Sequence, residues 1–298
     1  MNTAVNRRPS PALVAHLAAA VSAQRARIEE VLTRAERLDD ERVLHDLRVA
    51  LRRTAAVAKL TRGFPSADSG EPLRRTAREL RRFLSPHRTL EVCVARLTTR
   101  FRRDAARHAV ALKLAKRIAP AAGDAAPASR DGHLFLTALR AAFAIRDAEL
   151  SPFSRPFAAV LPSRSDERLA RLVRRRLRKR RKRLLASGVP ERDTLHPLRI
   201  EAKDLRYGLE FVRDLVPGVP GLLKEFQQFQ DVAGDAHDRI ELIHVVGDAA
   251  SSGSPALRRG ARSLVVPLER DAALALRRAQ ASAQTLLAHL SRCEISWT

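Results

Sequence analysis

Apolar residues recur at three- and four-residue spacing along nearly the whole chain, and this period constrains the fold more than any other feature of the sequence. Residues at these intervals share one face of an α-helix, whereas a half-buried strand needs strict alternation. Ala, Leu, Arg and Glu are abundant and favour helix, while alternating β-branched residues are scarce. The pattern therefore predicts an all-α protein.

Clusters of Gly, Pro, Ser and Asp interrupt the helical pattern and predict the turns between helices. These clusters fall at residues 63–70, 119–131, 151–165, 187–190, 217–221 and 251–255. About seven or eight helices of ordinary length fit between them. The chain has 298 residues, 45% of them hydrophobic, which is enough for one large core or two modest ones.

The N-terminal segment has two interpretations. Arg7 and Arg8 precede an apolar stretch over residues 11–21, a pattern also seen in secretory signals. However, one helical apolar stripe continues from Leu13 to Leu38 without a break, which favours the first helix of a bundle.

Two further features concern the compartment. The chain has no run of about 18 consecutive apolar residues, so no transmembrane helix is expected. Cys93 and Cys293 are the only cysteines and form neither a disulfide framework nor a metal-binding spacing. These features predict a cytoplasmic protein without a metal site, a cofactor or a membrane partner.

The charge of the chain is its clearest functional signal. There are 56 Lys and Arg residues against 33 Asp and Glu, which gives a formal net charge of +23. Such an excess repels itself unless anions are present, so it indicates a polyanionic partner. Arginines outnumber lysines by 49 to 7, and guanidinium binds phosphate oxygens in a bidentate manner. A GC-rich genome would also favour arginine, but it would not create the net charge.

Two nonapeptides resemble each other and predict an internal duplication. Residues 45–53 read HDLRVALRR and residues 196–204 read HPLRIEAKD. They share a histidine, a leucine two residues on, an arginine three residues on and a cation seven residues on. The chain is thus expected to contain two related helical halves, over residues 10–150 and 160–295.

The second copy predicts a ladder of cations on one helix face. With His196 at zero on a helical wheel, Arg199, Lys203 and Arg206 lie at about −60°, −20° and −80° and form a stripe about 15 Å long. Leu198 and other leucines lie on the opposite side of the wheel. A line of cations at one-turn spacing suits a ligand with repeated negative charges, although a solvated helix face would show the same pattern.

The first copy predicts a similar but shorter ladder. Its members are His45, Arg48 and Arg52, followed by Lys59. Ala55 stands where the second copy has Arg206, so one rung is missing.

A further basic cluster covers residues 174–183, where only Leu177 is not Arg or Lys. Arg176 and Arg180 fall within the apolar stripe of this helix rather than opposite it. Because an unpaired buried charge is unfavourable, both are predicted to face a shared basic cavity. The alternative is that their long side chains reach solvent.

Enzymatic activity is not expected. The adjacent His45 and Asp46 resemble part of a metal phosphohydrolase site, but no companion ligands can be named, and the nearby Arg48 and Arg52 would repel a cation. The net charge alone would attract DNA or RNA, so binding of nucleic acid, or of polyanions in general, is one function to consider. Only 4% of residues are aromatic, which provides few stacking platforms for single strands.

The two histidine motifs carry a resemblance to a known family. The segment LHPLRI at residues 195–200, followed by Lys203, Leu205, Arg206 and Tyr207, resembles the CHAD domain, the conserved-histidine α-helical domain. The HDLRVALRR segment and the FQD segment at residues 229–231, with Gly234 and Asp238, extend the resemblance to residues 10–295 as a single domain.

The resemblance implies two pseudo-symmetric four-helix bundles around a basic central cavity. It also implies non-enzymatic binding of inorganic polyphosphate and association with polyphosphate granules. The first half departs from the family pattern at Ala55 and over residues 85–89, where only Arg88 of a Gly-x-x-Arg-Asp segment is retained. The residues expected to bind polyphosphate are His45, Arg48, Arg52, Arg53, Lys59, Arg88, Arg176, Arg180, His196, Arg199, Lys203, Arg206 and Tyr207.

Overall fold

The computed structural model describes three long stretches of the chain, residues 89–124, 163–214 and 218–293. It also describes residue 216 and single helical residues of the first part of the chain, namely 23, 26, 27, 30, 45, 46, 49, 50, 52, 53, 55, 56, 59 and 60. Within these described residues the regular structure is helical and no strand occurs, which confirms the all-α prediction.

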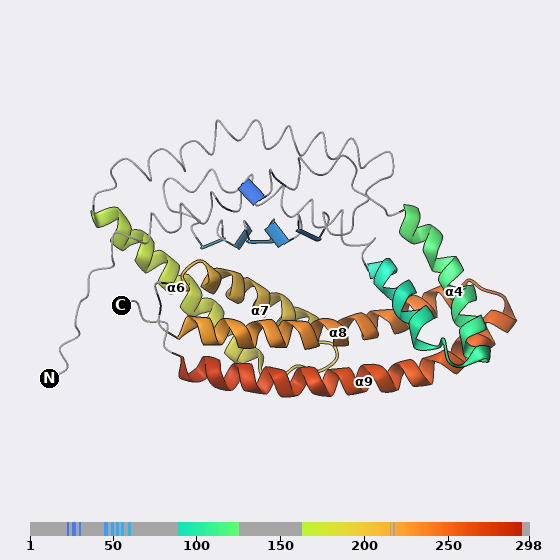
Figure 1. The fold of residues 1–298 in the computed structure, drawn as a ribbon. Coiled ribbons are helices and arrows are strands. Elements are labelled where there is room, and N and C mark those ends of the chain that lie inside the picture. The colour runs from blue at the N-terminus through green and yellow to red at the C-terminus, as the bar shows by residue number, and fades with distance from the viewer. Residues whose placement is uncertain are drawn as a thin grey trace.

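A helix over residues 89–100 is followed by five longer helices (Figure 1). These are α4 (Ala105–Asp124), α6 (Ser163–Ser187), α7 (Leu195–Glu210), α8 (Val219–Ser251) and α9 (Pro255–Arg292). Predicted turns at 187–190, 217–221 and 251–255 lie at the ends of these helices. The turn predicted from residue 119 begins too early, because α4 continues to Asp124.

The two longest helices, α8 and α9, form an antiparallel hairpin that runs along the molecule (Figure 1). The connection between them is short, since α8 ends at Ser251 and α9 begins at Pro255. Ser254 caps the start of α9: its hydroxyl accepts a hydrogen bond of 3.2 Å from the Leu257 amide, and Pro255 occupies the first helical position. This hairpin provides the surface against which the other described helices pack.

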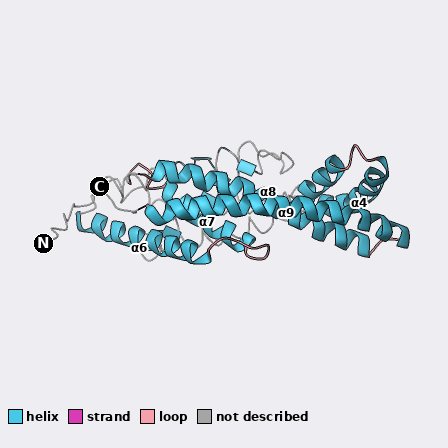
Figure 2. Ribbon diagram, turned by 90° about the horizontal axis from the view of Figure 1, so that it is seen from below, coloured by secondary structure: helices cyan, strands magenta, loops and turns pink. Residues whose placement is uncertain are grey.

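Helices α6 and α7 pack at one end of the hairpin, and α4 packs at the other (Figure 2). The turn after α6 contains Gly188, whose φ of 64° is left-handed and suits glycine. Gly208 of α7 allows a close approach to α6, because a Cβ atom there would lie 2.9 Å from Leu177 Cδ2. The side chains of Phe226, Phe229 and Leu177 are fully buried in the core between these helices.

The prediction of two pseudo-symmetric bundles stays a prediction, because much of the first half lies outside the described residues. The same holds for the boundary between residues 10–150 and 160–295. Among the described helices, none combines the length and the apolar character of a membrane span.

Candidate functional site

The predicted cation ladder lies on α7 and faces other elements of the protein rather than open solvent. Leu198, Leu205 and Leu209 are buried on the core side of this helix. On its other side, the side chains of Arg199, Lys203 and Arg206 are half-buried, whereas His196 at the start of the helix is exposed. The ladder is therefore partly enclosed, which distinguishes it from a solvated helix face.

A cavity of about 240 Å³ lies beside the start of the ladder. It is formed by α7, α8, the helix over residues 89–100 and residues of the first histidine motif. Its walls are His45, Val49, Arg52, Thr89, Val92, Cys93, Arg199, His237, Asp238 and Glu241. The two histidine motifs, predicted separately from the sequence, thus meet at one cavity.

Arg199 is a half-buried cation that contacts the backbone of α8 closely. Its Nη2 would lie 3.3 Å from a Cβ atom at Gly234, so the absence of a side chain there makes room for the guanidinium. Its Nε is buried without a hydrogen-bond partner among the described residues. Burial lowers the Arg199 pKa, and the charge of Arg52 lowers it further, while Asp238 opposes both effects. Arg199 is consequently a half-buried cation without a hydrogen-bonded carboxylate partner among the described residues, and a bound anion would stabilise it.

Lys203 lies one helical turn after Arg199 and shares its surroundings. Burial lowers the pKa of its amine to about 7, with further lowering by Arg199 and Arg52. Among the described residues, Lys203 makes neither a hydrogen bond nor an ion pair, and the same is true of Arg52. These three residues, Arg52, Arg199 and Lys203, are called the central cations below.

A histidine pair borders the central cations. His196 Nδ1 lies 3.2 Å from His237 Nε2, and the ring centroids are 4.5 Å apart. Burial lowers the His237 pKa to about 4, and the neighbouring His196 and Arg199 contribute. Burial likewise lowers the His196 pKa. Because both pKa values are lowered, the two rings are neutral at pH 7, and the N–H group of one ring donates a hydrogen bond to the unprotonated nitrogen of the other.

Sequence reasoning missed His237 and Glu241, which line the cavity from α8. The available signal was their helical spacing: His237 and Glu241 follow Gly234 by one and two turns, next to Asp238 of the motif. Asp238 was noted in the motif but was not predicted to lie at the site.

Three other predicted ligand residues have carboxylate partners within the protein. Lys59 Nζ pairs with Asp204. Arg206 Nε donates to Glu210 Oε1 at 2.8 Å, and Arg53 Nε lies 3.3 Å from Glu210 Oε2. These pairs reduce the positive charge that the three side chains offer to a ligand.

Arg206 also has partners beyond Glu210. Its Nη1 donates to Gln230 Oε1 at 2.6 Å, and its guanidinium carbon lies 5.4 Å from the ring centroid of Tyr207. Tyr207 itself is buried, with 6% of its surface exposed. This end of the ladder is therefore more internally satisfied than the end at Arg199.

Arg176 and Arg180 point inward from α6, as their place in the apolar stripe predicts. Arg176 Nη1 donates to the carbonyl oxygens of Lys59 and Leu60 at 3.0 and 2.7 Å. Arg180 Nη1 donates to the carbonyl oxygen of Asp204 at 3.0 Å. Both guanidinium groups connect α6 to neighbouring segments through main-chain oxygens, and their contact with a ligand stays a prediction. Arg48 and Arg88 lie outside the described residues.

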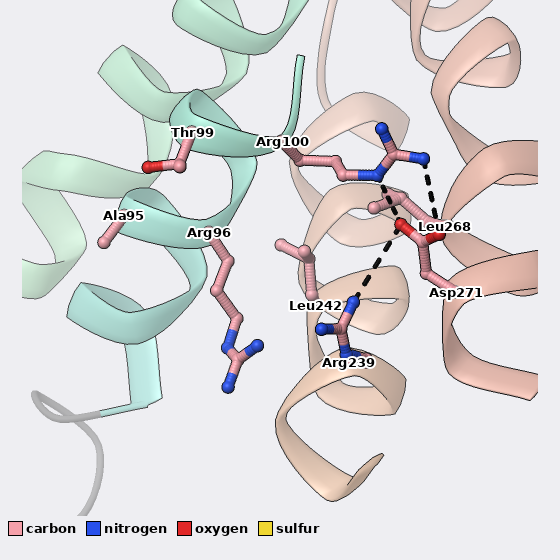
Figure 3. A pocket seen from close by; sticks show the side chains of 8 residues that line it. All are labelled: Ala95, Arg96, Thr99, Arg100, Arg239, Leu242, Leu268 and Asp271. Atoms are coloured by element: carbon pink, nitrogen blue, oxygen red, sulfur yellow. Dashed lines mark hydrogen bonds and ion pairs between the residues drawn. The ribbon is translucent and has the colours of Figure 1, made fainter. Parts of the chain in front are cut away.

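A second pocket, of about 340 Å³, lies between the helix over residues 89–100, α8 and α9 (Figure 3). In it Arg100 and Arg239 converge on the carboxylate of Asp271 (Figure 3). Arg96 pairs with Asp235 at 2.8 Å and with Asp238 at 3.4 Å. These ion pairs connect the helix over residues 89–100 to the α8–α9 hairpin. The pair with Arg96 also helps to position Asp238, which lines the first cavity.

The geometry defines an all-helical protein with a partly enclosed cationic cavity to which separate histidine motifs contribute. The chain belongs to the CHAD domain family, whose family model matches residues 15–247. Within the described residues no group of three His, Cys, Asp or Glu side chains could hold a metal ion.

Two solved structures are similar in fold. One is PptA from Streptomyces chartreusis, with 17% identity, a TM-score of 0.66, and coverage of 91% of this chain and 99% of that one. The other is the crystal structure of the CHAD domain from the plant Ricinus communis, with 20% identity, a TM-score of 0.61, and coverage of 95% and 93%. A search of curated proteins gave no match.

Proposed function

We propose that the protein binds inorganic polyphosphate, without catalysing a reaction on it, in a basic cavity between two pseudo-symmetric helical bundles. One observation carries this proposal: Arg52, Arg199 and Lys203 are half-buried together and have no anionic hydrogen-bond partner among the described residues. Such a cluster is unfavourable by itself, and a bound anion would relieve both the desolvation and the mutual repulsion.

The linear arrangement of cations on α7 favours an extended anionic ligand over a compact one. The ladder on α7 continues from Arg199 through Lys203 to Arg206, with one helical turn between successive cations. A chain of phosphates can contact several rungs at once, so affinity should increase with chain length until the ladder is filled. Polyphosphate also has no bases or sugars, which suits a cavity of about 240 Å³. We further propose that this binding places the protein at polyphosphate granules in the cytoplasm.

Nucleic-acid or general polyanion binding is a second candidate function, and the outer face of α6 favours it. Arg171, Arg175, Arg178 and Lys182 are exposed, and their spacing places them within one narrow stripe of the helix. We call these four residues the α6 outer row. The row is open enough for a duplex, whereas the cavity is not.

Competition at physiological salt separates the two functions. We expect unlabelled long polyphosphate to displace a labelled polyphosphate at least about tenfold better, per unit charge, than duplex DNA or RNA, and pyrophosphate to compete poorly. Changing the three central cations to glutamine should abolish most of the polyphosphate binding. Changing the α6 outer row to glutamine is the matched control with equal or greater charge removed. Equal competition by DNA, or a larger loss from the outer row, would support the second function.

Asp238→Asn is expected to raise polyphosphate affinity. The Asp238 carboxylate lines the cavity and opposes the lowering of the Arg199 and Lys203 pKa values. Its negative charge therefore offsets part of the positive charge that would attract an anionic ligand, and it would repel that ligand. Removing one such charge should strengthen binding roughly 3- to 10-fold. Isothermal titration with polyphosphate of defined length measures the effect. Asp231→Asn, an exposed site on the same helix, is the control, and weaker binding by Asp238→Asn would contradict the expectation.

A further inference from the structure

Lys203 differs from the other six lysines of the chain. Five of them are exposed, namely Lys113, Lys116, Lys179, Lys182 and Lys224. Lys59 is half-buried but pairs with Asp204. Lys203 alone combines partial burial with the lack of a carboxylate partner among the described residues.

Lys203 lies within a cluster of arginines, two of which, Arg52 and Arg199, line the cavity. Arg199 and Arg206 lie one turn before and one turn after it on α7. The charge of Arg52, from the first histidine motif, also acts on Lys203. Glu210 is engaged by Arg53 and Arg206. Asp238 pairs with Arg96 and also acts on Lys203, but burial and the neighbouring cations outweigh its charge.

The amine is also in the reactive form at neutral pH. Burial and the neighbouring cations lower the Lys203 pKa to about 7, so an unprotonated amine is accessible near neutral pH. An ordinary lysine with a pKa near 10.4 has well under about 0.1% of its amine unprotonated there. A desolvated lysine beside other cations is a known arrangement for nucleophilic chemistry.

We propose that Lys203 is an acylation site for small acyl phosphates. The phosphate end of such a molecule binds Arg199 and Arg52, which line the cavity, and its carbonyl group extends along α7 towards Lys203, one helical turn after Arg199. The amine nitrogen forms a bond to the carbonyl carbon while the bond from that carbon to the phosphate oxygen breaks. The amine proton leaves with inorganic phosphate, and the product is an amide that carries no charge.

Acylation has a consequence for ligand binding, and this part rests on the proposed polyphosphate function. The amide removes one of the three central cations and adds bulk beside Arg199. A charge-assisted contact to phosphate is lost, and polyphosphate affinity is expected to fall about tenfold or more. The site would then couple the supply of acyl phosphates to the release of polyphosphate.

The direct test treats the full-length protein with acetyl phosphate at pH 7.5 and follows acetylation of each lysine by mass spectrometry. Lys203 should react at least about tenfold faster than Lys224, an exposed lysine of α8. Lys179 and Lys182 are the sharper controls, because they are exposed within the basic run of α6 and report on attraction by cations alone. A rate at Lys203 no higher than at these residues would overturn the proposal.

The pH profile tests the reason for the reactivity. The groups that act on the Lys203 amine are Arg199, Arg206, Arg52 and Asp238. The rate at Lys203 should rise up to about pH 7–8 and then level off, because the amine is fully unprotonated above its pKa. The rates at the exposed controls should continue to rise towards pH 10. A Lys203 rate that also climbs towards pH 10 would contradict the proposal.

Two variants complete the experiment. Arg52→Gln should slow acetylation of Lys203 at pH 7.5, because it removes a phosphate-binding group and a charge that lowers the amine pKa. An unchanged rate would exclude Arg52 from the site.

Lys203→Arg keeps the cation but cannot be acylated, so its polyphosphate binding should resist acetyl phosphate while that of the unaltered protein falls. Acetylation of Lys203 without any loss of binding would overturn the regulatory consequence. Absence of polyphosphate binding before treatment would refute the proposed function and leave the acetylation result standing.

Discussion

Arg199→Gln is expected to lower the affinity for polyphosphate roughly 10- to 100-fold while leaving the melting temperature unchanged or higher. The loss follows from a charge-assisted phosphate contact, which is worth about 1.5–3 kcal/mol. The change in stability has the opposite sign, because the guanidinium is half-buried, its Nε has no partner among the described residues, and Arg52 repels it. Replacing such a charge by a neutral side chain is often neutral or stabilising.

Titration calorimetry and thermal unfolding of the same preparation would measure both effects. Arg178→Gln is the matched control, since it removes the same charge from the exposed face of α6. The control should change affinity by a factor of about 2 or less. A fall in both affinity and melting temperature for Arg199→Gln would indicate that Arg199 mainly holds the fold together, and its assignment to the ligand site would then be wrong.

Phe229→Ala is expected to destabilise the protein by about 3–5 kcal/mol, because the ring is fully buried and a cavity would remain in its place. Phe229 belongs to a motif shared with the family, but its exposed fraction is 0%, so its role is packing of α8. The melting temperature should fall by roughly 5–15 °C.

Chemical denaturation followed by circular dichroism would measure this change. Leu274→Ala, at a position of α9 where 47% of the leucine is exposed, should change the free energy of unfolding by no more than about 0.5 kcal/mol. At a temperature where the Phe229→Ala variant remains folded, its polyphosphate affinity should match that of the unaltered protein. A variant of undiminished stability would show that the core around α8 can refill the space.

In the basic run of α6, the helical period predicts the direction of the side chains but not their partners. Its apolar stripe correctly placed Arg176 and Arg180 on the inward side of the helix. Their partners, the carbonyl oxygens of Lys59, Leu60 and Asp204, belong to segments far from α6 along the chain. No local pattern in the sequence indicates which main-chain oxygens will lie within reach of a guanidinium.

Lys59 and Lys203 are both predicted members of the two ladders, and the structure gives them different surroundings. Lys59 meets the carboxylate of Asp204, whereas Lys203, next to Asp204 in the chain, has no ion-pair partner among the described residues. Adjacent residues of a helix point in directions about 100° apart, so Asp204 turns away from the amine beside it and towards the other segment.

The sequence by itself determined the helical class, the boundaries of several helices, and the separation of a cationic face from a leucine face on α7. These properties depend on residues three and four positions apart, and such residues are neighbours in any helix. Only the tertiary structure decided which cations lack a partner, that His237 approaches His196, and that the Lys203 pKa falls to about 7. Those properties depend on burial and on charges from distant segments, and packing alone brings these together.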